Sequence, residues 1–170
     1  MERLSKSILT IANPFNDAHI ELFEKFEQDN DLQLQIATTL QSIRSKTTEQ
    51  EYKSLLKNSN EINIVLFETV NGEIVDSCSI QGAKDIKTCN ITFAPLMNKT
   101  KRPILTSATD YALAVLDMEE VFISIDPNDK NMISNLNNCN YENLGEENGC
   151  VMYLKEKEEQ KSPTQISQLY

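Results

Sequence analysis

Three cations stand close together in an otherwise acidic chain: Lys99, Lys101 and Arg102. The 170 residues carry a formal net charge of −10, so this basic loop, residues 99–102, differs in sign from the rest of the chain. Pro103 follows it directly and suits the first turn of a helix. Cationic side chains at a helix start can bind an anion through charge-assisted hydrogen bonds. A basic loop that is simply solvated explains the same residues, and the sequence leaves both interpretations open.

Side chains that usually hold metals or act as nucleophiles are sparse. His19 falls on or beside the apolar stripe of an expected helix, so we expect it to pack against the core rather than to catalyse. The four cysteines stand singly, and no metal site is indicated. We expect reduced thiols inside apolar surroundings, with disulfide pairing as the alternative. The cysteines are Cys78, Cys89, Cys139 and Cys150, of which the first two are expected to be buried and unreactive on adjacent strands.

Charge and length argue against several classes of function. A net charge of −10 opposes general binding to nucleic acid or to an anionic membrane, because both need a cationic surface. No stretch is long enough to cross a membrane, and the apolar run 8–12 is too short for the core of a signal peptide. We therefore expect a cytoplasmic protein. Residues 1–156 are expected to form a single domain, and residues 157–170 a polar C-terminal tail.

The basic loop lies inside an expected βαβ unit. Residues 85–95 alternate like a half-buried strand, and residues 103–117 carry apolar side chains at helical spacing. Residues 121–125 are β-branched and aromatic, as in a short buried strand. A strand joined to the next by a helix implies parallel pairing with a right-handed connection.

The remaining elements complete one mixed sheet with helices. Asn71-Gly72 is expected to join two antiparallel strands in a tight hairpin, because both positions of a type I′ turn need a positive φ. Thr48 to Glu51 has the spacing of a capping box at a helix start. The class expected is α/β (α+β), with a mixed, mostly antiparallel central sheet and one βαβ unit. The other elements expected are strands 7–12, 61–67, 73–81 and 149–154 and helices 15–26, 31–45, 47–57 and 129–138.

This order of elements resembles the GCN5-related N-acetyltransferase (GNAT) family over about residues 7–155. Ile104-Leu105 with Ala108, Tyr111-Ala112 and Leu116 is similar to the central helix of that family, and residues 118–125 are similar to its next strand. Residues 133–141 resemble the short helix that normally ends in Gly-Phe. The resemblance implies acetyl-CoA as the acyl donor and a small-molecule or peptide amine as the acceptor.

The resemblance also implies where acetyl-CoA would lie. It would run along the strand at 85–95, with its pyrophosphate on the following loop and helix start. Pantetheine needs a gap beside that strand, so the resemblance implies that the sheet opens between the strands at 85–95 and 121–125. The family writes this loop as Arg or Gln, two residues, Gly, one residue, then Gly or Ala. Here the corresponding positions hold Leu96, Lys99 and Lys101, so cationic side chains would have to replace backbone donors. The residues implied to bind the coenzyme are Phe93, Ala94, Lys99, Thr100, Lys101, Arg102 and Asn128.

The catalytic residues stay unassigned. Many family members have a Tyr in the short helix that protonates the departing thiolate, and the matching place holds Leu136. The resemblance implies a carboxylate base near the middle strands, for which Glu68, Asp76 and Asp85 are available. The first interpretation is an acetyl-CoA-dependent N-acetyltransferase-like protein. The alternatives are a catalytically degenerate member that acts as a binding or regulatory module, and an unrelated α/β fold.

Overall fold

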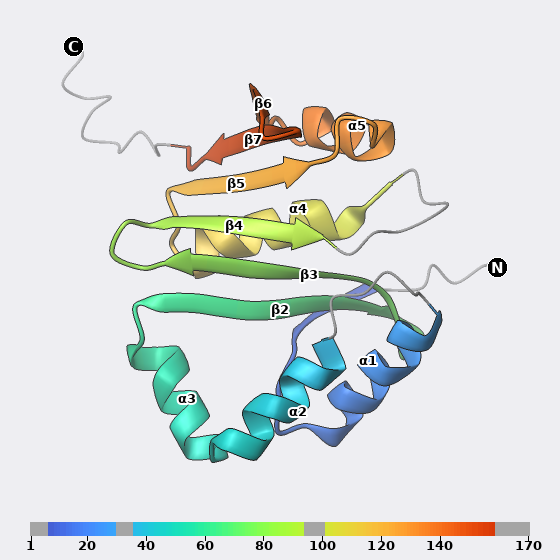
Figure 1. The fold of residues 1–170 in the computed structure, drawn as a ribbon, viewed down its shortest axis with the longest axis vertical. Coiled ribbons are helices and arrows are strands. Elements are labelled where there is room, and N and C mark those ends of the chain that lie inside the picture. The colour runs from blue at the N-terminus through green and yellow to red at the C-terminus, as the bar shows by residue number, and fades with distance from the viewer. Residues whose placement is uncertain (1–6, 30–35, 94–100, 159–170) are drawn as a thin grey trace, which may run out of the picture.

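The computed structural model describes residues 7–29, 36–93 and 101–158. Its strands form one sheet in the order β1-β2-β3-β4-β5-β7-β6 (Figure 1). Neighbouring strands are antiparallel except β4 and β5, which are parallel and are joined through helix α4. This arrangement confirms the expected class and the βαβ unit. The strands are β1 Ser7–Ile11, β2 Glu61–Val70, β3 Glu73–Ala83, β4 Thr88–Phe93, β5 Glu120–Ile125, β6 Glu142–Glu147 and β7 Cys150–Glu156.

Helices cover the two faces of the sheet unequally. In Figure 1, α4 lies behind β3 and β4, while α1, α2 and α3 gather beside β2. Thr48 caps α3 by accepting the Glu51 N–H at 3.1 Å, as the capping box predicts. The Glu51 carboxylate then accepts from the Thr48 hydroxyl. The helices are α1 Asp17–Asp29, α2 Ile36–Lys46, α3 Glu49–Asn58, α4 Pro103–Asp110 and α5 Lys130–Asn138.

Two apolar clusters pack on opposite faces, because successive side chains of a strand alternate. Leu66 of β2 packs with α4 residues such as Leu105 in the larger cluster. The next residue, Phe67, packs with Phe23 of α1 and Leu40 of α2 in the smaller one. The α4 side therefore carries the main core, and the other face is covered by helices over β1 to β3.

The hairpin between β2 and β3 forms as expected. Asn71 has a φ of 54° and Gly72 a φ of 79°, the two positive values that a type I′ turn requires. The next reversal is longer than expected, because β4 begins at Thr88 rather than at residue 85. Lys87, with a φ of 52°, completes that reversal.

The expected single helix 103–117 is wrong in its second half. The α-helix ends at Asp110, and Tyr111–Val115 form a π-helical turn in which the Leu116 N–H donates to the Tyr111 carbonyl at 3.0 Å. A π turn holds more residues than an α turn, so it rotates the following side chains around the helix axis. Val115, assigned to the apolar stripe from its spacing, is therefore 65% exposed, while Met118 is buried.

The sequence pattern also missed one strand. β6, Glu142–Glu147, is exposed along its length and carries no apolar alternation, so it lacks the usual signal. It forms because Asn148 and Gly149, with φ values of 53° and 81°, turn the chain into β7. The last strand extends to Glu156, slightly beyond the expected 154.

Candidate active site

The two parallel strands pair over part of their lengths only. Thr88, Cys89 and Asn90 of β4 are matched with residues 120–122 of β5, and the pairing stops there. β4 continues to Phe93 and β5 to Ile125, and Figure 1 shows the two arrowheads moving apart. The expected opening of the sheet is confirmed. We call residues 91–93 and 123–125 the diverging edges; their backbone groups are not used in pairing between β4 and β5.

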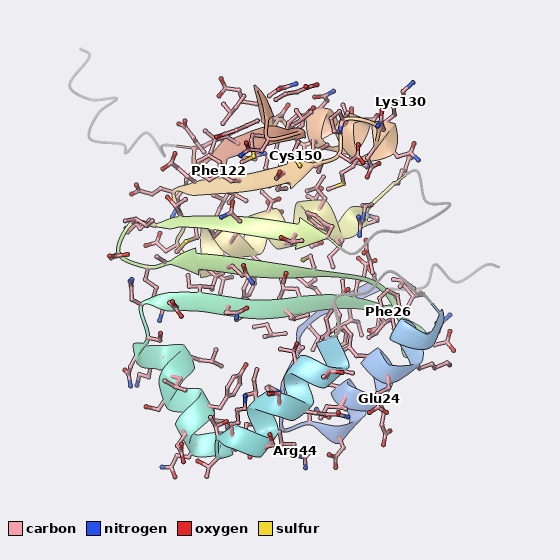
Figure 2. The ribbon with its side chains drawn as sticks, viewed as in Figure 1. Glu24, Phe26, Arg44, Phe122, Lys130 and Cys150 are labelled. Atoms are coloured by element: carbon pink, nitrogen blue, oxygen red, sulfur yellow. The ribbon has the colours of Figure 1, made fainter. Side chains whose placement is uncertain are left out.

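Two helices begin at this same end of the sheet. Parallel strands bring their carboxyl ends to one edge, so α4 starts beside the end of β4 and α5 beside the end of β5. Asn135, in the second half of α5, connects that helix to the start of α4, because its Oδ1 accepts the Arg102 N–H at 3.3 Å. Asp129 caps α5 by accepting the Met132 N–H at 3.1 Å. Lys130, labelled in Figure 2, is the first residue of α5 and is exposed.

A buried ion pair fixes the start of α4 to β3. Arg102, the residue before the helix, donates from Nη2 to Asp76 Oδ1 at 2.6 Å and from Nε to Asp76 Oδ2 at 3.0 Å. The side chains are only 8% and 2% exposed. The Arg102 guanidinium also lies 4.9 Å from the centre of the Phe93 ring, at the end of β4. Arg102 therefore connects Phe93, at the end of β4, to Asp76 of β3.

Glu68 lies beside this ion pair. It is opposite Asp76 in the β2–β3 register, directly before a shift in that register, and it is 6% exposed. Residues opposite each other share a face of the sheet, so both carboxylates lie on the α4 side. Two buried carboxylates and one guanidinium thus lie on the α4 face of the sheet.

The structure separates the site residues expected from the sequence. Phe93 and Arg102 are in contact, whereas Lys101 is exposed on the solvent side of the helix start. Asn128 is exposed after β5, and its N–H donates to Asp126 Oδ1 at 2.8 Å. Ala94, Lys99 and Thr100 lie outside the described residues. The role expected for Arg102 as an exposed cation changes, because its guanidinium turns inward to Asp76.

The three carboxylates considered as bases are separated as well. Asp85 is exposed in the turn before β4, at the opposite end of that strand, where it accepts from the Asn60 side chain at 3.0 Å. It cannot act near the diverging edges. Asp76 is paired with Arg102, and Glu68 is a second buried carboxylate on the same face of the sheet. Leu136 is fully buried in the main core.

His19 is a packing residue, as expected. Its Nδ1 accepts the Asn13 N–H at 2.9 Å, and its ring meets the Phe67 ring edge-on with 5.1 Å between centres. Burial lowers the pKa of this imidazole.

The cysteines carry free thiols, so the disulfide alternative is excluded in this structure. Cys78 on β3 and Cys89 on β4 are fully buried, as expected. Cys139 and Cys150 differ from the expectation of burial, since both are partly exposed. Figure 2 shows Cys150 at the start of β7.

Sequence reasoning missed the pairing of Asp76 with Arg102. The two residues are 26 positions apart, and only the stacking of β3, β4 and the start of α4 brings them together. Asp76 was visible as a carboxylate in a strand, and Arg102 as part of a basic loop. Nothing in their spacing connects them.

Within the described ranges, no group of three or more His, Cys, Asp or Glu side chains is arranged to hold a metal ion. Over the same ranges, no helix is both long enough and apolar enough to span a membrane.

The sequence matches no family model and no curated protein. Solved structures nevertheless share its fold. PseH, an N-acetyltransferase of Campylobacter jejuni in complex with acetyl coenzyme A, has a TM-score of 0.60 at 11% identity, over 90% of this chain and 100% of that one. Ribosomal-protein-S5-alanine acetyltransferase from Vibrio fischeri has a TM-score of 0.67 at 10% identity, over 95% and 98%. Spermidine N-acetyltransferase from Vibrio cholerae has a TM-score of 0.56 at 12% identity, over 89% and 94%. This chain therefore has the fold of the GNAT acetyltransferases, although its sequence differs greatly from theirs.

Proposed function

We propose that this protein is an acetyl-CoA-dependent N-acetyltransferase. The observation that carries the proposal is the end of pairing between β4 and β5 after Asn90, with two helix starts at the same end. An extended ligand with amide groups can add to a free strand edge through backbone hydrogen bonds, and pantetheine is such a ligand. Phosphate groups favour helix starts with nearby cations, and Lys101 and Lys130 are exposed there.

The chemistry needs little from side chains. Acetyl-CoA supplies an activated thioester, and the lone pair of a neutral amine attacks its carbonyl carbon directly. The carbon–sulfur bond breaks, the acetyl group stays on nitrogen, and coenzyme A leaves as a thiol after the amine proton is transferred. Backbone N–H groups at the diverging edge of β4 would polarise the carbonyl.

Glu68 is the side chain we propose as the base. It is buried on the α4 face opposite Asp76 of β3, the strand that separates it from β4. A carboxylate can take the amine proton directly or through one water molecule. The thiolate has no Tyr at Leu136 to protonate it, so solvent would have to supply that proton.

A second function remains a candidate because of two specific residues. Leu136 occupies the place of the family Tyr, and Lys101 occupies a place where the family has Gly or Ala. Both differences would be tolerated in a module that binds acetyl-CoA without transferring its acetyl group.

Titration calorimetry with acetyl-CoA, followed by an assay of thiol release with a panel of amines, tests the proposal. Micromolar binding together with amine-dependent thiol release is expected. Binding without release from any amine would favour the binding module. Absence of binding would contradict both candidates.

Glu68→Gln is the matched variant for the base. We expect a loss of kcat of about a hundredfold or more, with unchanged binding of acetyl-CoA, since base catalysis typically contributes about 10²–10⁴-fold. Glu61→Gln, at the exposed start of the same strand, is the control and should leave kcat unchanged.

A further inference from the structure

Three polar contacts connect α4 to α5 and to the residues that follow α5. On the α4 side they come from positions 102, 106 and 109, which are three or four residues apart and so lie along one face of the helix. Their partners follow in the same order, so the two helices run side by side in the same direction. We call these contacts the α4–α5 seam. They join the Arg102 N–H to Asn135 Oδ1 at 3.3 Å, Thr106 Oγ1 to Cys139 Sγ at 3.3 Å and Thr109 Oγ1 to Tyr141 Oη at 2.5 Å.

The seam connects the two parts of the sheet that move apart. α4 follows β4, and α5 follows β5. The two strands are paired from Thr88 to Asn90 of β4, and Figure 1 shows them diverging beyond that point. The contact of Arg102 with Asn135 lies at the diverging end, because the Arg102 guanidinium is stacked on Phe93, the last residue of β4. Where the strands no longer hold each other, the helices that follow them do.

Apolar side chains of both helices lie below the seam, in the main core on one face of the sheet. Packed helices keep their axes about 8–10 Å apart, whereas paired strands are only about 4.8 Å apart. Direct packing of α4 against α5 therefore favours a wider spacing of β4 and β5 than continued pairing would allow. The buried residues are Leu105 and Ala108 of α4 and Met132 and Leu136 of α5.

The spacing that the helices favour suits an extended ligand between the strands. A chain that lies between two strands needs them about 9.6 Å apart, which is twice the ordinary strand spacing. Hydrogen bonds between N–H and C=O groups hold only over about 2.7–3.2 Å. A gap that widened by about an ångström would therefore lose the contacts of the ligand on one side. The width of the gap decides how well pantetheine fits the diverging edges.

We propose that the α4–α5 seam sets the width of this gap, and that Asn135 is a positioning residue for acetyl-CoA. This inference rests on the proposed function, since it concerns how the same site is held. Asn135 Nδ2 donates to the Asn131 carbonyl at 2.7 Å, which leaves Oδ1 for the Arg102 N–H at the start of α4. Asn135 therefore acts through the backbone of Arg102 and does not touch the reacting atoms.

Asn135→Ala tests the positioning role in the full chain. Alanine favours helices more than asparagine does, so α5 should form, which circular dichroism checks. We expect the KM for acetyl-CoA to rise about three- to tenfold, the effect of one lost hydrogen bond, with kcat at saturation within about twofold. Asn137→Ala makes the same substitution at an exposed position of α5 outside the seam and should leave both constants unchanged. A purely structural role would lower thermal stability without changing this KM.

The rate at which iodoacetamide modifies Cys139 reports on the seam without any ligand, because this partly exposed thiol contacts Thr106 across it. We expect modification several-fold faster in Asn135→Ala than in Asn137→Ala or the unmodified protein. A KM for acetyl-CoA that Asn135→Ala does not change overturns the inference and leaves the acetyltransferase proposal standing. A raised KM with an unchanged rate at Cys139 overturns it as well, since Asn135 would then act on its immediate surroundings and not through the seam. Failure of the unmodified protein to bind acetyl-CoA would overturn both proposals.

Discussion

Arg102 and Asp76 form a two-point ion pair that ties the start of α4 to β3. The shorter of its two bonds is 2.6 Å, and the Asp76 side chain is only 2% exposed. Because Arg102 also stacks on Phe93, the same guanidinium contacts the last residue of β4. The arrangement gives this protein a side-chain anchor between β3, the end of β4 and the start of α4.

Asp76→Asn should destabilise the protein strongly. The change leaves the Arg102 guanidinium buried without its counter-charge, and breaking one partner of a buried pair costs roughly 3–5 kcal/mol. Denaturant unfolding gives the free energy of unfolding. Asp117→Asn removes one partner of an exposed pair with Lys157 and serves as the control, with little change expected. Equal effects of the two substitutions would contradict the anchoring role of Asp76.

Arg102→Lys should weaken the binding of acetyl-CoA, with a smaller effect on the free energy of unfolding. Lysine keeps the charge but lacks the planar fork, so it cannot make both bonds to Asp76 and lie over Phe93 as the guanidinium does. The loop end at Lys101 would then be less well positioned. We expect KM for acetyl-CoA to rise several-fold while kcat at saturation stays within about twofold. A change confined to thermal stability would show that the contact is only structural.

Local patterns predicted much of this fold because they depend on neighbouring residues alone. Asn71-Gly72 formed the expected hairpin, and Thr48 capped α3 through the expected backbone donor. In β2 the apolar residues Ile62, Ile64 and Leu66 are buried, as a half-buried strand requires, although residues 66–68 are all buried because helices cover both faces there. In each case the physical cause lies within a few residues of the effect.

The features that were missed depend on distant parts of the chain. β6 exists because β7 offers its edge, and its own residues are all exposed. The π turn at Tyr111–Val115 cannot be read from apolar spacing, which fitted an unbroken helix. The basic loop was visible, but only the fold shows that Arg102 turns inward and Lys101 outward.

Substituting Lys99 and Lys101 together by Ala should weaken binding of acetyl-CoA by about 1–3 kcal/mol, if each makes a charge-assisted hydrogen bond. Exposed side-chain charges are screened by salt, so the dissociation constant of the unmodified protein should rise steeply with ionic strength. The double variant should show a shallower dependence. Lys46→Ala with Lys53→Ala removes the same charge from α2 and α3 and is the control. A dissociation constant that the first pair does not change would remove these lysines from the site.

His19 should make stability depend on pH below neutrality. Burial lowers the pKa of its imidazole from the ordinary value of 6.5, so the folded protein binds the proton less readily than the unfolded chain. The contribution of neutral His19 to the free energy of unfolding is fully present above pH 6.5. It is lost as the pH falls through that value toward the lower pKa of the folded protein. Protonation would also remove the Nδ1 acceptor for the Asn13 N–H.

Unfolding curves between about pH 7.5 and pH 5.0 check this pH dependence. The range extends about one to two units to either side of the ordinary pKa of histidine. His19→Asn keeps a side-chain acceptor but does not titrate. The difference in free energy of unfolding between the unmodified protein and this variant should therefore narrow as the pH falls. A difference that stays constant with pH would show that His19 contributes by packing alone.

The four thiols should divide into two reactive and two protected ones. Burial raises the pKa of the Cys78 thiol, with nearby Asp76 adding to the effect, and burial raises the pKa of Cys89 to about 11. At pH 8 about one Cys89 thiol in a thousand would be ionised, and the thiolate is the reactive form. Cys139 and Cys150 are partly exposed.

Iodoacetamide added to native protein at pH 8 should modify Cys139 and Cys150 first, as peptide mass spectrometry would show. The same reagent in denaturant should modify all four. Rapid modification of Cys78 or Cys89 in the native protein would mean that β3 and β4 separate in solution, which would contradict the packing that supports the diverging edges.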